Sequence, residues 1–123
     1  MINLRDFFDA YDGAFRETAK SIAQFYFEPC ITARMGVPRL NATRTDTESF
    51  FGQVLEKYRA QGFDHGQILN LESQSLGANS VLATIRWSFK DKGDKTLWEG
   101  TFSYNLYKRD ERWQILLQTM HDS

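Results

Sequence analysis

Residues 80–90 read SVLATIRWSFK, and residues 98–106 read WEGTFSYNL. Apolar and polar side chains alternate along both stretches, which is the period of a β-strand with one face against a core. The inner face of the first stretch would carry Val81, Ala83, Ile85, Trp87 and Phe89. The inner face of the second would carry Trp98, Gly100, Phe102, Tyr104 and Leu106. The polar turn between the two predicts antiparallel neighbours whose aromatic rings share one face.

The chain beyond Gly62 continues this pattern. Turns at residues 76–79, 91–94 and 109–111 divide it into four strand-like segments, which is typical of an antiparallel meander. The last segment is apolar on both faces, which predicts a central or covered strand. Its alternation assigns to the inner face Trp113, Ile115, Leu117 and Thr119. The outer face of the meander would then carry Leu82, Leu116 and Met120.

The first half of the chain has the period of amphipathic helices. A helix is predicted over residues 3–17 with Asn3 as its N-cap. Its buried stripe would consist of Leu4, Phe7, Phe8, Tyr11, Ala14 and Phe15. A second, short helix is predicted over residues 18–25, and Pro29 would end it.

Two short strands and a third helix complete the first half. The strands are expected at residues 30–35 and 39–43, joined by a turn. In the helix that follows, the Thr45 hydroxyl and the Glu48 carboxylate would form a capping box, and Gly62 would end the helix. The elements together predict an α+β fold, one domain over residues 1–123. In it, the helices cover the inner face of a curved antiparallel sheet, as in a cone-shaped barrel.

Composition argues against several classes of function. The 123 residues include 15 basic and 16 acidic side chains, so no net field would attract nucleic acid. No apolar stretch is long enough for a membrane span and the amino terminus has no signal-peptide pattern, so we expect a cytoplasmic protein that contacts no membrane. Cys30, the one cysteine, is expected to be a buried apolar residue. With His65 and His121 it has no metal-site spacing, and we expect neither metal nor cofactor.

The order of these elements, with Arg112, Trp113, Gln114 and Ile115 in the last strand, resembles the nuclear transport factor 2-like superfamily and its SnoaL-like members. The resemblance implies a cone in which a bent sheet and helices enclose a pocket. It also implies a homodimer that pairs through the outer face of the sheet. Because the superfamily includes isomerases, hydrolases, dehydratases, cyclases and binding proteins, the resemblance by itself assigns no reaction.

Individual residues depart from the catalytic patterns of this superfamily. Tyr11 falls where ketosteroid isomerases place an oxyanion-binding tyrosine, but the stretch that holds their general base reads ITARM at residues 31–35 and contains no carboxylate. The related epoxide hydrolases use an Arg and an Asp two residues apart, whereas Arg86 is followed by Trp87 and Ser88. Whether this protein is an enzyme therefore stays open.

The sequence predicts a pocket for a small apolar or aromatic ligand. Its expected ligand-binding residues are Tyr11, Phe15, Trp87, Trp98, Tyr104 and, at the mouth, His121. An alternative is a cofactor-free lyase or isomerase in which Tyr11 polarises a carbonyl and His121 or His65 moves a proton. Another is a dimerisation or adaptor module that pairs through its outer face. For Arg34, exposure at a strand edge is favoured over burial, which would require an anionic partner.

Overall fold

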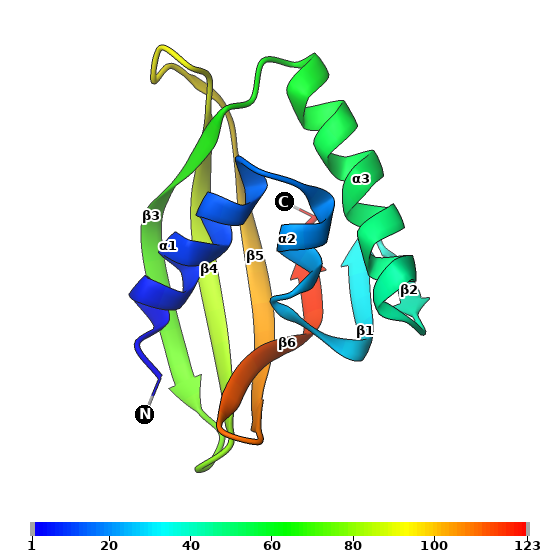
Figure 1. Ribbon diagram of the computed structural model, residues 1–123. Coiled ribbons are helices and arrows are strands. Elements are labelled where there is room, and N and C mark those ends of the chain that lie inside the picture. The colour runs from blue at the N-terminus through cyan, green and yellow to red at the C-terminus, as the bar shows by residue number, and fades with distance from the viewer. Residues whose placement is uncertain (1, 123) are drawn as a thin grey trace.

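The computed structural model of the protein describes residues 2–122. Within these residues the helices are α1 (Leu4–Phe15), α2 (Ala19–Ala23) and α3 (Arg44–Ala60). The strands are β1 (Tyr26–Arg34), β2 (Val37–Asn41), β3 (His65–Ser75), β4 (Ser80–Lys90), β5 (Thr96–Arg109) and β6 (Arg112–Met120). They form one sheet in the order β2-β1-β6-β5-β4-β3, and the helices lie against one of its faces (Figure 1).

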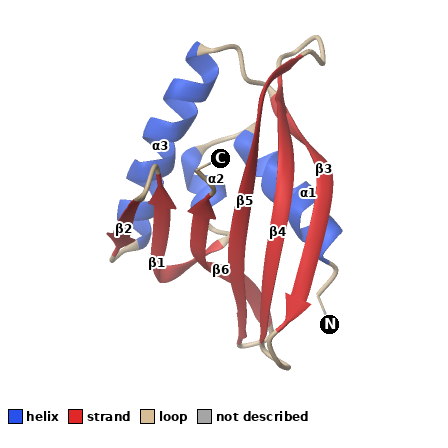
Figure 2. Cartoon of the chain, turned by 180° about the vertical axis from the view of Figure 1, so that it is seen from behind, coloured by secondary structure: helices blue, strands red, loops and turns tan. Residues whose placement is uncertain are grey.

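The α+β class is confirmed, but the sheet is mixed. Strands β3 to β6 form the predicted antiparallel meander, and β1 and β2 form an antiparallel pair. The expectation of a wholly antiparallel sheet is wrong where β1 runs parallel to β6. These two strands belong to different hairpins, so no tight turn fixes their relative direction. The sheet does not close, and β2 and β3 are its edges (Figure 2).

Side-chain caps define where the helices begin. Asn3 accepts a hydrogen bond from the Asp6 backbone at 3.0 Å, as predicted. In α3 the capping box is formed by Thr43 and Asp46, with bonds of 3.1 and 3.2 Å, two residues before the predicted box of Thr45 and Glu48. Both pairs have the same spacing, and an Asp at the third position fills the role of Glu. Among the described residues, no helix has the length and apolarity to cross a membrane.

Pro29 was expected to end the second helix, and this is wrong. Helix α2 ends at Ala23, and Pro29 lies within β1. The ladder between β1 and β6 is interrupted between Tyr26 and Ile31. A strand tolerates proline at such an irregularity because no ladder hydrogen bond is required from its nitrogen.

A register shift in β6 reverses which side chains face the helices. Ile115 pairs with Leu106, but Leu117 pairs with Asn105, so Leu116 is an extra residue in this strand. After such a bulge the alternation changes face. Gln118 lies opposite Tyr104 and Met120 opposite Phe102, both on the inner face. The inner assignment of Leu117 and Thr119, and the outer assignment of Met120, are therefore wrong.

The core lies between the concave face of the sheet and the helices. Trp87, Phe102 and Ile115 are all buried on that side, as the alternation predicted. The fully buried side chains come from α1, α2, α3 and five of the strands, and the largest are Tyr26, Tyr104, Phe8, Phe51, Ile22, Ile85, Leu106 and Ile115. Cys30 is also buried, and its thiol lies 3.3 Å from the Thr47 hydroxyl.

The outer face of the sheet is more polar, with a small apolar area near the β2 edge. Ile31 and Leu40 pair across β1 and β2 and are 37% and 66% exposed. Leu82 and Leu116 are half-buried. Association of two copies through this face stays a prediction.

Candidate functional site

Three buried side chains from α1, β1 and β6 form a hydrogen-bonded cluster on the concave face. The hydroxyls of Tyr11 and Tyr26 lie 2.7 Å apart. The Gln118 amide nitrogen donates to Tyr26 at 3.0 Å and to Tyr11 at 3.4 Å. Burial raises the pKa of both phenols above their ordinary value of 10.0. A ligand carbonyl would have to displace one of these partners to bind Tyr11.

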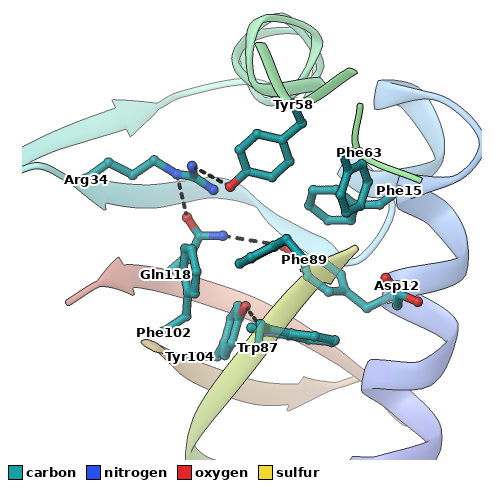
Figure 3. Close-up of a pocket in the computed structure, with 11 residues that line it drawn as sticks. Asp12, Phe15, Arg34, Tyr58, Phe63, Trp87, Phe89, Phe102, Tyr104 and Gln118 are labelled. Atoms are coloured by element: carbon teal, nitrogen blue, oxygen red, sulfur yellow. Dashed lines mark hydrogen bonds between the residues drawn. The ribbon is translucent and has the colours of Figure 1, made fainter. Parts of the chain in front are cut away.

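Arg34 joins this cluster from the end of β1 (Figure 3). Its Nε donates to the Gln118 carbonyl oxygen at 3.3 Å, and its Nη1 donates to the Tyr58 hydroxyl at 3.1 Å. The guanidinium also lies over the rings of Phe102, Phe50 and Tyr58, with its central carbon 5.3, 5.6 and 5.9 Å from their centroids. All of these partners are uncharged.

The exposed position expected for Arg34 is wrong, because the residue is half-buried on the inner face. It has the same parity as Cys30 and Thr32, which are both buried. The strand ends beneath α3, so Tyr58 and Phe50 cover the side chain from above. An arginine near a strand end is normally solvated, and here the helix closes off much of that solvent.

The predicted pocket between Tyr11, Phe15, Trp87 and Tyr104 is almost filled. The Trp87 indole donates to the Tyr104 hydroxyl at 3.0 Å, which brings these two rings together (Figure 3). An inner cavity of about 20 Å³ remains. That volume holds about one water molecule, so an organic ligand does not fit there without rearrangement.

A second, open cavity begins where the inner one ends, between α3 and the ends of β1, β5 and β6. We call it the outer cavity; its volume is about 600 Å³. It shares with the inner cavity Arg34, Tyr58, Phe89 and Phe102. Its other lining residues include Trp98, Phe50, Met120, Arg39, Lys57, Gln53 and Glu99. Trp98 is therefore separated from the other four predicted aromatic residues, which line the inner cavity or its wall.

The two histidine side chains have hydrogen-bond partners outside the inner cavity. His121 borders the outer cavity, but it is exposed and its Nε2 lies 2.8 Å from the Ser103 hydroxyl. Ser103 and its ladder partner Thr84 lie on the outer face of the sheet. Because Leu116 is an extra residue in β6, His121 lies on this outer face as well. His65 lies between Asp64 and Asp94, at 2.8 and 3.0 Å. Within residues 2–122, no three His, Cys, Asp or Glu side chains gather as metal ligands.

Asp12 is a carboxylate at the inner cavity that the sequence did not single out. One of its oxygens accepts a hydrogen bond from the Gly66 backbone at 2.7 Å. A Cβ on Gly66 would lie 2.9 Å from that oxygen and 3.1 Å from the Trp87 ring, so a larger residue would displace the Asp12 carboxylate. Burial raises the pKa of the Asp12 carboxyl above its ordinary value of 3.8. The folded protein therefore favours the protonated form of Asp12 more than the unfolded chain does.

The Asp12→Asn variant tests that consequence. A raised pKa means that Asp12 contributes stability below its unfolded pKa and loses this contribution as the pH rises through its folded pKa. We expect the free energy of unfolding of Asp12→Asn to rise relative to that of the wild type as the pH increases from about 3 to about 7, because Asn does not titrate. Urea unfolding across this range measures the difference. Asp9→Asn, the same change at an exposed position of α1, is the control, and an equal gain there would contradict the assignment.

Sequence reasoning missed the polar centre of the site. The sequence favours a surface position for Arg34 and does not single out Tyr58 or Gln118. One signal was available: a glutamine between apolar neighbours in a strand with two apolar faces is a candidate for a buried hydrogen-bonding role.

The family comparison agrees with this architecture. A family described as NTF2-like protein (DUF6841) matches residues 3–123. The chain belongs to this family. The resemblance to the nuclear transport factor 2-like superfamily is thus confirmed. No curated protein matches this NTF2-like chain significantly.

Solved structures share the NTF2-like fold at low identity. An NTF-2 like protein of unknown function from Shewanella oneidensis has 18% identity and a TM-score of 0.75, covering 97% of this chain and 96% of its own. A putative calcium/calmodulin dependent protein kinase II association domain from Xanthomonas campestris has 17% identity and a TM-score of 0.72, with coverages of 98% and 86%. A putative aromatic ring hydroxylase from Novosphingobium aromaticivorans has 14% identity and a TM-score of 0.71, covering 95% of this chain and 84% of its own. The TM-scores show that these proteins share the NTF2-like fold. The low sequence identities assign no shared activity.

Proposed function

We propose that this NTF2-like chain binds a small molecule with an aromatic or apolar body in the outer cavity. The observation that carries the proposal is a cavity of about 600 Å³ whose lining includes a group of aromatic side chains: Phe50, Tyr58, Phe89, Trp98 and Phe102. Ligand sites commonly have about 300–1,000 Å³ and combine apolar walls with a few polar groups. The polar groups here include the guanidinium of Arg34 and the hydroxyl of Tyr58, which are hydrogen-bonded to each other.

The aromatic wall offers a face for a flat ligand. Phe89 and Trp98 stack with their centroids 5.1 Å apart and an interplanar angle of 19°. Tyr58 meets both rings edge-on, at 5.5 and 5.1 Å. Trp98 remains half-buried, so part of its ring is open for contact. Stacked and edge-to-face aromatic contacts contribute about 0.5–1.5 kcal/mol beyond the burial of apolar area.

The geometry does not favour the lyase or isomerase alternative. Its two groups would have to act on the same substrate, but Tyr11 lines the inner cavity and the His121 ring is bonded to Ser103 outside. His65 is held between two aspartates. We therefore propose binding without assigning a reaction.

Methyl NMR of the labelled methionines tests the proposal. Met120 lines the outer cavity and is half-buried, whereas Met35 lies at its rim and is 79% exposed. We expect a bicyclic aromatic probe, either 2-naphthamide, 2-naphthoate or indole, to shift the Met120 methyl signal saturably. Absence of a saturable Met120 shift with all three probes would overturn the proposal.

A variant that places a side chain in the outer cavity, together with a matched control, tests whether the probe binds there. Gly100 lines the outer cavity, and a Cβ there makes only ordinary contacts, the shortest being 3.4 Å to Phe102. Gly100→Leu should therefore fold and place a branched side chain inside the cavity, and should weaken probe binding at least about tenfold. Gly52→Leu makes the same change on α3, where no atom lies within 4 Å of the added Cβ, and should bind normally. Equal binding by the two variants would count against the outer cavity.

A further inference from the structure

We infer that the ligand of the outer cavity is a carboxylate, and that its oxygens accept hydrogen bonds from Arg34. This inference rests on the proposed binding function and names the chemical class of the ligand. It follows from three features of the cavity: a half-buried cation without a counterion, a donor that has no partner, and an excess of positive charge at the rim.

Arg34 is a cation whose partners are all neutral. Its hydrogen bonds go to the Gln118 amide oxygen and the Tyr58 hydroxyl. Among the ion pairs of residues 2–122, none involves Arg34. A charge that is largely removed from water without a counterion destabilises the folded protein unless another group compensates for it. The three aromatic rings around the guanidinium supply part of that compensation, and an anion would supply the rest.

The free donor of Arg34 belongs to the surface of the cavities. Nε and Nη1 have acceptors, but within residues 2–122 no hydrogen bond involves Nη2. The residue lines both the inner and the outer cavity. Nη1 and Nη2 together form the fork that binds the two oxygens of a carboxylate in a planar, bidentate arrangement. Because Arg34, Phe89 and Trp98 line the same cavity, a ligand with a carboxylate on an aromatic body has a partner for each of its two parts.

The charges around the cavity also favour an anion. Arg39 and Lys57 line it together with Arg34. The carboxylate among the described lining residues is Glu99, and it lies 3.3 Å from Arg86. A cleft with more positive than negative charge raises the local concentration of anionic ligands.

Two variants remove the free charge of Arg34 in different ways. Arg34→Met deletes the guanidinium and retains an apolar side chain. Gln118→Glu retains the guanidinium but places a carboxylate at the atom that lies 3.3 Å from Nε, where it would act as an internal counterion. Arg5→Met is the matched control, because it removes an exposed arginine of α1 that does not line the outer cavity.

Calorimetric titration with 2-naphthoate and 2-naphthamide tests the inference, since the two probes differ mainly in charge. We expect the wild type and Arg5→Met to bind 2-naphthoate at least about tenfold more tightly than 2-naphthamide. Arg34→Met and Gln118→Glu should lose this preference by weakening only the binding of 2-naphthoate. If Arg34→Met does not fold, Gln118→Glu decides the test.

The outcomes separate this inference from the proposed function. Equal affinity of the wild type for both probes would overturn the carboxylate inference and leave the binding function intact. A preference for 2-naphthoate that persists in both Arg34→Met and Gln118→Glu would overturn the role of Arg34. Failure of both probes and of indole to bind would overturn the binding function itself.

Discussion

Replacement of Phe51 by alanine is expected to lower the free energy of unfolding by about 3–5 kcal/mol. Phe51 is fully buried on α3, and its ring meets Tyr26 at 5.1 Å and Phe15 at 5.9 Å between centroids. It therefore links α3 to both α1 and β1. Truncation removes the transfer free energy of the ring and leaves a cavity that these rigid aromatic neighbours cannot fill.

Urea unfolding followed by circular dichroism measures this loss. Phe51→Leu, which leaves a smaller void, should cost less than half as much. Phe50→Ala provides a comparison on the same helix, because Phe50 is only half-buried and lies beneath the guanidinium groups of Arg34 and Arg39. Equal losses for Phe51→Ala and Phe50→Ala would contradict the burial that the structure assigns to Phe51.

Replacement of Gln118 by leucine is expected to lower the free energy of unfolding by about 2–3 kcal/mol. Gln118 is buried and bonds to three groups: the hydroxyls of Tyr11 and Tyr26 and the Nε of Arg34. The change preserves the approximate volume but removes both the amide donor and its oxygen. The largest part of the loss should come from Arg34, because a buried charged donor would lose an acceptor.

The control for this change is Gln74→Leu, at an exposed position on the outer face of β3. It should alter the free energy of unfolding by no more than about 0.5 kcal/mol. Wild-type stability of Gln118→Leu would mean that the cluster of Gln118, Tyr11, Tyr26 and Arg34 contributes little to the fold. In that case the assignment of Gln118 as the partner of Arg34 would have to be abandoned.

Much of the architecture was predictable, because it depends on periodicity. The alternation at residues 80–90 and 98–106 identified β4, β5 and their buried faces, and the stripe around Phe8 and Tyr11 identified α1. These features repeat every two residues or every three to four, so a single sequence displays them. The parallel pairing of β1 with β6 has no such local signature, since it joins residues 86 to 89 positions apart in the chain.

The site was less predictable, because it depends on tertiary details. The inner face of β6 changes after Leu116, and a strand with apolar residues on both faces gives no sign of where its bulge lies. The burial of Arg34 depends on α3 lying over the end of β1. The size of the inner cavity depends on how the rings of Trp87 and Tyr104 meet, which a residue pattern does not encode.

The extra residue in β6 has an implication for comparing this chain with its relatives. Each side chain after Leu116 in β6 lies on the opposite face of the sheet from the face it would occupy if the strand had no bulge. A homologue of the same length that pairs this strand without the bulge would direct the counterparts of Leu117 and Thr119 inward, and a glutamine aligned with Gln118 would point to solvent. Deletion of Leu116 itself would remove the bulge and leave Gln118 opposite Tyr104, so the polar lining would stay in place. Functional residues in this family are therefore best matched by ladder partners and not by alignment columns.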